Sequence, residues 1–90
     1  MRPLPSDLLR SFAVVAQTGS FTVASERVCL SQSTVSQQIR RLEDLVGQPL
    51  FERDTRHVRL SRHGEVLHRY ARKILEMMDE AVTELLHLHP

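Results

Sequence analysis

The stretch LSQSTVSQQIRRLEDLVG, residues 30–47, decides the fold of this chain. Ser31 is a suitable N-cap and Gly47 a suitable C-cap, so the sequence predicts one helix between them. At about 100° per residue, two faces of that helix differ in chemistry. One is an apolar stripe made of Val35, Ile39, Leu42 and Val46. The other is short and polar and consists of Ser33, Ser36, Gln37 and Arg40, with Asp44 at its far end.

The apolar stripe predicts a buried face, whereas the polar face allows two interpretations. Short hydrogen-bonding side chains suit a helix that lies in a DNA major groove, where base edges present patterned donors, acceptors and thymine methyl groups. An ordinary solvated face has the same helical spacing. This stretch alone therefore leaves both interpretations open, and its surroundings must decide.

Charge is unevenly distributed along the 90 residues, although the net charge is only +1. Residues 40–73 hold nine Arg or Lys against five Asp or Glu, while residues 74–90 hold four acids and no Arg or Lys. Eleven of the twelve bases are arginine, whose planar fork suits phosphate and guanine, although genomic composition bias explains the same excess. The length predicts one domain, or one domain with an appendage.

A lone cysteine, Cys29, excludes an internal disulfide, so nothing points to an oxidising compartment. We expect it to be a small, partly buried thiol rather than a redox sensor. No apolar run is long enough for a membrane span, and the N-terminus lacks the pattern of a signal peptide. These features predict a cytoplasmic protein with no membrane partner.

Two helices are expected before the opening stretch. Ser6 can cap the first, and Gly19 ends it. Thr22 can cap a second, short helix with Glu26 in its first turn. Only residues 29–31 separate that helix from the next, and two helices joined by such a turn form a helix-turn-helix whose second helix reads DNA. The inward side chains of the short helix are expected to be Ala24, Ser25 and Val28.

The next segment changes to a strand pattern. Leu50–Glu52 and Val58–Leu60 are short strand candidates on either side of a polar tip, residues 53–57. Arg53 and Arg56 flank an Asp-Thr turn within that tip. A hairpin after a helix-turn-helix is a wing whose arginines can reach a phosphate or a narrow minor groove, although a plain solvated hairpin has the same pattern.

A last helix is predicted from a cap at Ser61 to about Leu88, with Gly64 tolerable in its first turn. Its apolar stripe has near-heptad spacing and is too long for the small preceding domain to cover. Part of it is therefore expected to meet a second copy of the chain, a missing domain, or both. The stripe consists of Leu67, Tyr70, Ala71, Ile74, Met77, Met78, Ala81, Val82, Leu85 and Leu88. The expected dimer contacts among them are Leu67, Tyr70, Ile74, Met77, Met78, Ala81 and Leu85.

One set of residues at fixed offsets is more specific than any short motif: Thr22, Ala24, Leu30, Ser31, Gln32, Ser33, Val35, Ser36, Gln38, Ile39, Leu42, Glu43, Gly47, Leu50, Phe51 and Arg53. With these residues the chain resembles the N-terminal domain of LysR-type transcriptional regulators, from Leu8 through the long helix. The resemblance implies a mainly α fold. A winged helix-turn-helix, with three helices and a short two-stranded wing, would occupy residues 1–60, and a long linker and dimerisation helix residues 61–90.

The resemblance also implies sequence-specific binding of double-stranded DNA by a homodimer that regulates transcription at an interrupted inverted repeat. Family members continue into a C-terminal domain that binds a small-molecule effector, and nothing in this chain corresponds to it; tetramers are expected only of a full-length chain. By position, base or groove contacts fall on Gln32, Ser33, Thr34, Ser36 and Gln37. Backbone and wing contacts fall on Thr22, Ser31, Arg40, Arg41, Arg53 and Arg56.

The departures from the family pattern leave the fold intact but affect the expected target. Gln37 stands where the family often has arginine, and glutamine prefers adenine where arginine prefers guanine. The other departures are Ser25 in place of a second alanine, Val28 and Val46 in place of leucine, and Ser61-Arg62-His63-Gly64 in place of Thr-Pro-Ala-Gly.

Enzymatic activity, a cofactor and a metal site are not expected. The sequence shows no Gly-rich loop, nucleophile elbow or paired carboxylates, and its five histidines lack cysteine partners and zinc-ligand spacing. The alternative from another class is a winged-helix module that docks proteins or dimerises without binding DNA. That alternative predicts acids or large apolar residues on the recognition face, which instead carries Gln32, Ser33, Ser36, Gln37 and Arg40.

Overall fold

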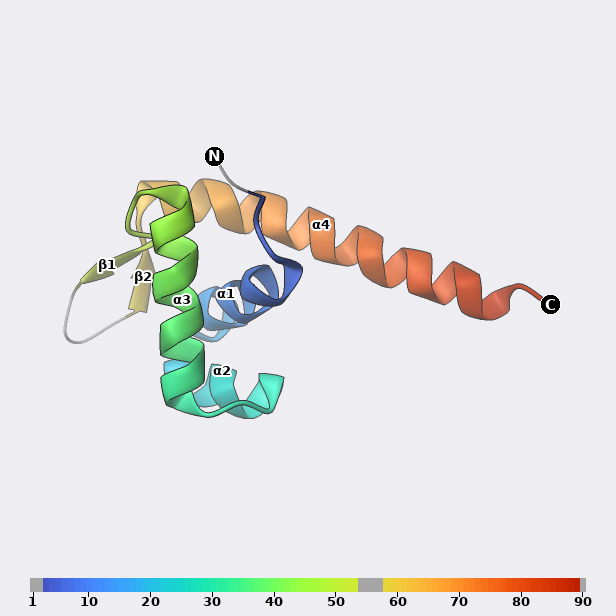
Figure 1. The fold of residues 1–90 in the computed structure, drawn as a ribbon, viewed down its shortest axis with the longest axis horizontal. Coiled ribbons are helices and arrows are strands. Elements are labelled where there is room, and N and C mark those ends of the chain that lie inside the picture. The colour runs from blue at the N-terminus through green and yellow to red at the C-terminus, as the bar shows by residue number, and fades with distance from the viewer. Residues whose placement is uncertain (1–2, 54–57, 90) are drawn as a thin grey trace.

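The computed structural model describes residues 3–53 and 58–89, which form helices and a two-stranded sheet (Figure 1). The elements are α1 (Ser6–Thr18), α2 (Phe21–Val28), α3 (Gln32–Val46), β1 (Phe51–Arg53), β2 (Val58–Leu60) and α4 (Arg62–His87). This order confirms the predicted architecture of three helices, a wing and a long last helix.

The core lies around Phe12 of α1. Its ring is fully buried and lies 5.5 Å from the ring of Phe51 between centroids, and Phe51 in turn lies 6.0 Å from Phe21. The apolar stripe of α3 is buried as predicted, except that Val46 at its end is half-buried. Each fully buried side chain of this size stabilises the fold by about 1.5–3 kcal/mol relative to exposure, so the cluster fixes α3 on α1. Its other members are Leu8, Leu9, Val15, Ala24, Val35, Ile39, Leu42, Leu50 and Ala71.

Four of the predicted helix ends are confirmed by their cap geometry. The hydroxyls of Ser31 and Ser61 each accept a hydrogen bond from the N–H three residues ahead, at 3.1 and 3.0 Å. Gly19 and Gly47 adopt left-handed φ angles of 67° and 81° after α1 and α3. Glycine has no side chain to disfavour that conformation, so both helices end there.

Two predicted caps are wrong because α1 and α2 start earlier than expected. Pro5, not Ser6, takes the N-cap position of α1, and proline has no side-chain group to accept a hydrogen bond. Ser20 caps α2, with its hydroxyl accepting from an N–H at 3.1 Å, so Thr22 lies inside the first turn. Glu26, predicted for that first turn, lies instead toward the C-terminal end of α2.

The wing is an antiparallel pair of β1 and β2. β1 begins one residue later than predicted, and the N–H of Leu50 is bonded to α3 rather than to the facing strand. This N–H donates to Oε2 of Glu43 at 2.8 Å, and the Leu50 carbonyl accepts from the N–H of Ser61 at 2.9 Å. These bonds connect the wing to α3 and to the start of α4. The predicted tip contact Arg56 lies outside the described residues. The paired residues are Phe51 and Leu60, Glu52 and Arg59, and Arg53 and Val58.

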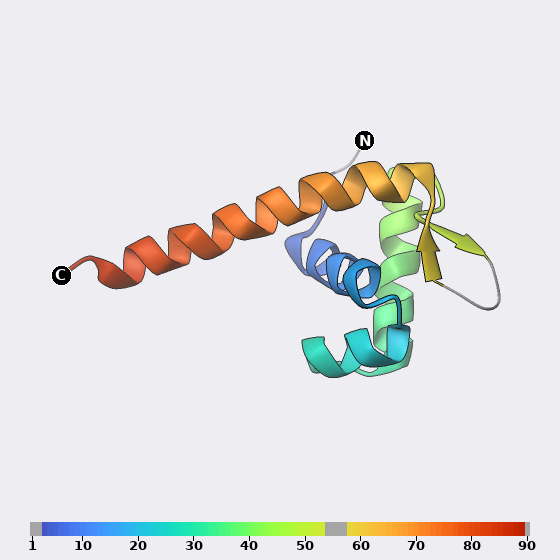
Figure 2. The ribbon, with the colours of Figure 1, turned by 180° about the vertical axis from the view of Figure 1, so that it is seen from behind.

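α4 has 26 residues, and its second half projects beyond the body of the molecule (Figures 1 and 2). In the first half Ala71 is buried and Leu67 is half-buried, so two members of the predicted stripe pack on the domain core. Leu75, at the middle of the helix, is also buried. Large apolar side chains in or next to α4 remain exposed at Val66, Tyr70, Ile74, Met77, Met78, Val82, Leu85, Leu86 and Leu88. No helix in the described part of the chain has the length and apolar character to cross a membrane.

Candidate nucleic-acid interface

A tight turn centred on Cys29 joins α2 to α3. Cys29 has a left-handed φ of 59°, and the N–H groups of Cys29 and Leu30 donate to the carbonyls of Glu26 and Ser25 at 3.3 and 3.0 Å. This pair of bonds is a Schellman motif, whose left-handed position usually holds glycine. The Cys29 side chain is exposed, so the prediction of a partly buried thiol is wrong. This conformation could not be predicted from the sequence, because the position holds no glycine.

The N-terminal end of α3 gathers hydroxyl and amide groups. The Ser31 hydroxyl oxygen lies 2.7 Å from that of Thr34 and 3.2 Å from that of Ser33. From α2, the Thr22 hydroxyl donates to Oε1 of Gln32 at 3.3 Å. The first backbone N–H groups of α3 and the positive end of the helix dipole lie at the same place, which favours a phosphate. The fold thus brings these five predicted contact residues together, all exposed except the half-buried Thr34.

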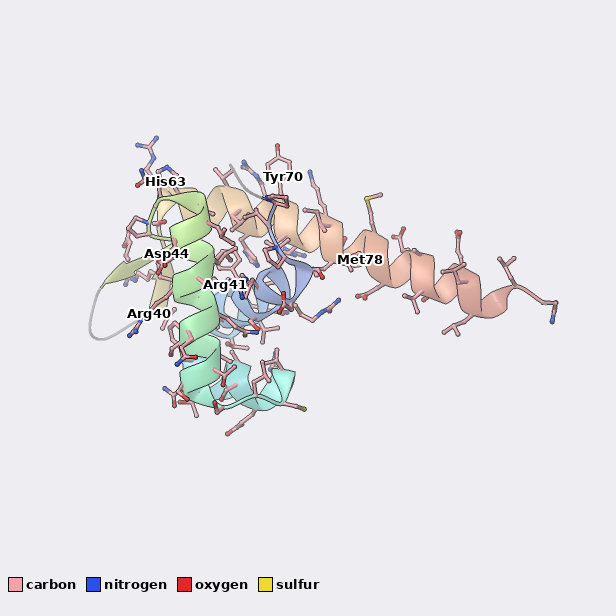
Figure 3. The ribbon with its side chains drawn as sticks, in the orientation of Figure 1. Arg40, Arg41, Asp44, His63, Tyr70 and Met78 are labelled. Atoms are coloured by element: carbon pink, nitrogen blue, oxygen red, sulfur yellow. The ribbon has the colours of Figure 1, made fainter. Side chains whose placement is uncertain are left out.

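The polar face continues along α3 through Gln37 and Arg40, which are exposed, and Ser36, which is half-buried. Arg40 and Arg41 follow Gln37 by three and four residues, so they flank it one turn further along the helix. Figure 3 shows Arg40 and Asp44 toward one edge of α3 and Arg41 toward the other. The exposed surface of α3 is therefore an amide and guanidinium face.

The wing carries an arginine that the sequence analysis missed. Arg59 of β2 is exposed and lies opposite Glu52 of β1. Side chains of a strand point alternately to opposite faces, and this rule would have predicted an exposed Arg59, because the residues on either side of it are half-buried. The predicted contact Arg53 is the last residue of β1.

The sequence also did not predict a partly buried polar contact between α1 and α3. Ser11 of α1 is 2% exposed, and its hydroxyl donates to Oε1 of the half-buried Gln38. A serine in the apolar part of α1 is the sequence signal that could have found it. Within the described residues, no group of three His, Cys, Asp or Glu is placed to hold a metal ion.

Comparisons with known proteins agree with this geometry. Residues 6–65 match the bacterial regulatory helix-turn-helix protein, lysR family. The chain is 48% identical over 84 residues to the HTH-type transcriptional regulator PecT of Dickeya dadantii (strain 3937) and 49% identical over 84 residues to DgdR of Burkholderia cepacia. These alignments cover 93% of the chain but 27% and 29% of the relatives, so the chain spans less than a third of their length.

A solved structure of a DNA complex shares the fold. The DNA-binding domain of BenM, bound to the benA site 1 DNA, superimposes with a TM-score of 0.88 at 32% identity, covering 96% of this chain and 100% of that one. The match includes the long last helix because it extends over almost the whole chain. From its sequence match and its architecture, this chain belongs to the lysR family of bacterial regulatory helix-turn-helix proteins.

Proposed function

We propose that this chain binds double-stranded DNA sequence-specifically as a homodimer and regulates transcription at an interrupted inverted repeat. The observation that carries the proposal is the exposed polar face of α3, on a helix whose opposite face is fixed in the core. Hydroxyl, amide and guanidinium groups match the donors and acceptors of base edges in the major groove. The helix enters the groove with its N-terminal end, as recognition helices of this motif do.

In this proposal the contacts divide into two kinds. Contacts to bases fall on Gln32, Ser33, Thr34, Ser36 and Gln37. Contacts to the DNA backbone fall on Thr22, Ser31, Arg40, Arg41, Arg53 and Arg56. Gln37 is exposed and flanked by arginines, so its amide can bond adenine while its neighbours hold phosphates.

The homodimer is proposed from the apolar surface that α4 leaves open. An apolar groove of about 940 Å³ lies beside the first half of α4, with Val46, Val66, Tyr70 and Ile74 among its lining residues. The exposed stripe continues from this groove to the end of the helix, through Met77 and Leu85. Monomeric proteins rarely expose an apolar surface of this extent.

The charges of α4 favour an antiparallel pair of helices. Residues 62–73 hold four Arg or Lys and one acid, whereas residues 74–87 hold four acids and no Arg or Lys. An antiparallel arrangement places each basic half beside the acidic half of the second copy. A parallel arrangement would place like charges together, which is unfavourable.

Selection of bound sequences from a random duplex pool tests the proposal. We expect the purified chain to enrich an inverted repeat whose half-sites are separated by about one DNA turn of 10 bp or a multiple of it. A variant with Gln37→Ala and Arg40→Ala should bind more weakly and enrich the repeat with a relaxed preference at the base pair that Gln37 contacts. A winged-helix module that only docks proteins would dimerise through α4 and bind no duplex, and that result would overturn the proposal.

Two further expectations apply to a longer chain of this family. An effector-binding region and assembly into tetramers are proposed only for a chain that carries the remaining length of relatives such as PecT and DgdR. As a bacterial-type regulator, such a chain would act in the cytoplasm, where the chromosome lies.

A further inference from the structure

We propose that Ser11 is a positioning residue for DNA reading, and that its bond to Gln38 sets the rotation of α3 about its own axis. This inference rests on the proposed function, because it requires that α3 reads bases. Neither residue belongs to the predicted DNA contacts. Ser11 acts from α1, on the side of α3 that faces away from the proposed groove.

The contact is a partly buried hydrogen bond between two helices. Ser11 is 2% exposed, and its hydroxyl donates to Oε1 of Gln38, which lies 27 residues further along the chain. Gln38 is half-buried and directly follows the exposed Gln37. Other polar contacts lie toward the two ends of α3, from Thr22 to Gln32 and from Leu50 to Glu43. The hydrogen bond from Ser11 reaches α3 near its middle, at Gln38.

Apolar packing fixes α3 on α1, and the Ser11 bond adds a directional constraint to that packing. Val35, Ile39 and Leu42 are buried but carry no hydrogen-bonding side-chain groups, so their contacts depend less on the exact rotation of α3 than a hydrogen bond does. A hydrogen bond is directional and is stronger inside a protein than in water. A rotation that breaks the Ser11 bond also turns Gln37 relative to the DNA.

Specific and non-specific binding depend differently on this rotation. Base contacts require correct hydrogen-bond geometry, whereas flexible arginines can hold phosphates over a range of helix orientations. If α3 occupies several rotations, only a fraction of molecules can read bases, and the specific Kd rises in proportion. Loss of the Ser11 hydroxyl should therefore reduce specificity and leave non-specific affinity unchanged.

Ser11→Ala tests this directly, on the selected duplex and on a scrambled duplex of equal length. The ratio of the two affinities should fall by about three- to tenfold, corresponding to one hydrogen bond, while binding to the scrambled duplex stays the same. Ser25→Ala is the matched control. Ser25 is also buried, but its hydroxyl donates at 2.7 Å to the Thr22 carbonyl within α2. Its replacement should leave the ratio at the wild-type value.

A double-mutant cycle separates positioning from general destabilisation. Gln38→Met removes the acceptor at similar volume, and the double variant with Ser11→Ala should lose no more specificity than either single variant. A wild-type ratio in both single variants, even with a lower Tm, would overturn the proposal, as would additive losses in the double variant. Absence of any selected duplex for the wild-type chain would instead overturn the proposed function.

Discussion

Gly64 shows how closely α4 approaches the segment before the wing. A Cβ atom at this position would lie far inside contact distance of the Leu50 carbonyl oxygen and 3.0 Å from a side-chain carbon of Leu60. The same Leu50 oxygen accepts the hydrogen bond from Ser61, so the backbone is held on both sides. Glycine is therefore required here by close packing rather than merely tolerated.

Gly64→Ala should destabilise the fold by about 1–3 kcal/mol through overpacking, although alanine favours a helix more than glycine does. Gly47→Ala is the comparison, because its Cβ would meet open space and only the left-handed φ of 81° opposes it, at about 1 kcal/mol. Denaturant unfolding measures both. A Gly64→Ala chain more stable than wild type would contradict the packing.

His68 gives the fold a pH dependence of known sign. Its ring meets Phe12 edge-on at 6.2 Å between centroids, and its pKa is lowered by burial and, second, by the charge of Arg72. The folded chain thus favours the neutral ring, and the unfolded chain binds the proton more readily. The contribution of His68 to the stability of the fold is complete above the unfolded pKa of 6.5 and decreases as the pH falls below that value.

Thermal melting between about pH 7.5 and pH 5.5 should therefore show a falling Tm. His68→Gln should make that dependence shallower. An identical pH profile in His68→Gln and wild type would exclude His68 as the source.

Among the helices, α2 depends on its cap at Ser20. Ser20→Ala removes the acceptor for the N–H of Val23 and should cost about 1 kcal/mol. Thr22→Ala, inside the first turn, should cost clearly less because Thr22 caps no N–H of α2. Equal losses of stability in the two variants, measured by denaturant unfolding, would argue against the observed helix start.

At the level of the whole molecule, exposed side chains of α4 should hold two copies together. Met77→Gln or Leu85→Gln should shift the chain toward monomer in sedimentation, because each removes apolar surface from the stripe. Thr83 lies on the opposite side of the same helix, so Thr83→Gln should leave the association of the two copies unchanged. A monomeric wild-type chain at high concentration would contradict the dimer.

Sequence patterns predicted the helices and strands well, but they predicted poorly the features that depend on contacts between these elements. α3 begins after Ser31 and ends before Gly47 as predicted, because caps and periodicity are local signals. Local sequence could not decide whether Ser20 or Thr22 caps α2, because both hydroxyls fit a cap. The half-buried Phe21, which follows Ser20, packs against Phe51, and that contact depends on the tertiary fold. The partner of Ser11, 27 residues away, likewise depends on how α1 meets α3.

Gln37 offers the most direct test of base reading by α3. Anisotropy titrations of the selected duplex should show that Gln37→Ala loses about 1–3 kcal/mol and relaxes the preference at one base pair. Gln17→Ala, which changes an exposed glutamine of α1, should bind as wild type does. If Gln37→Ala retained wild-type affinity and wild-type preference, the polar face of α3 would not be the surface that reads DNA.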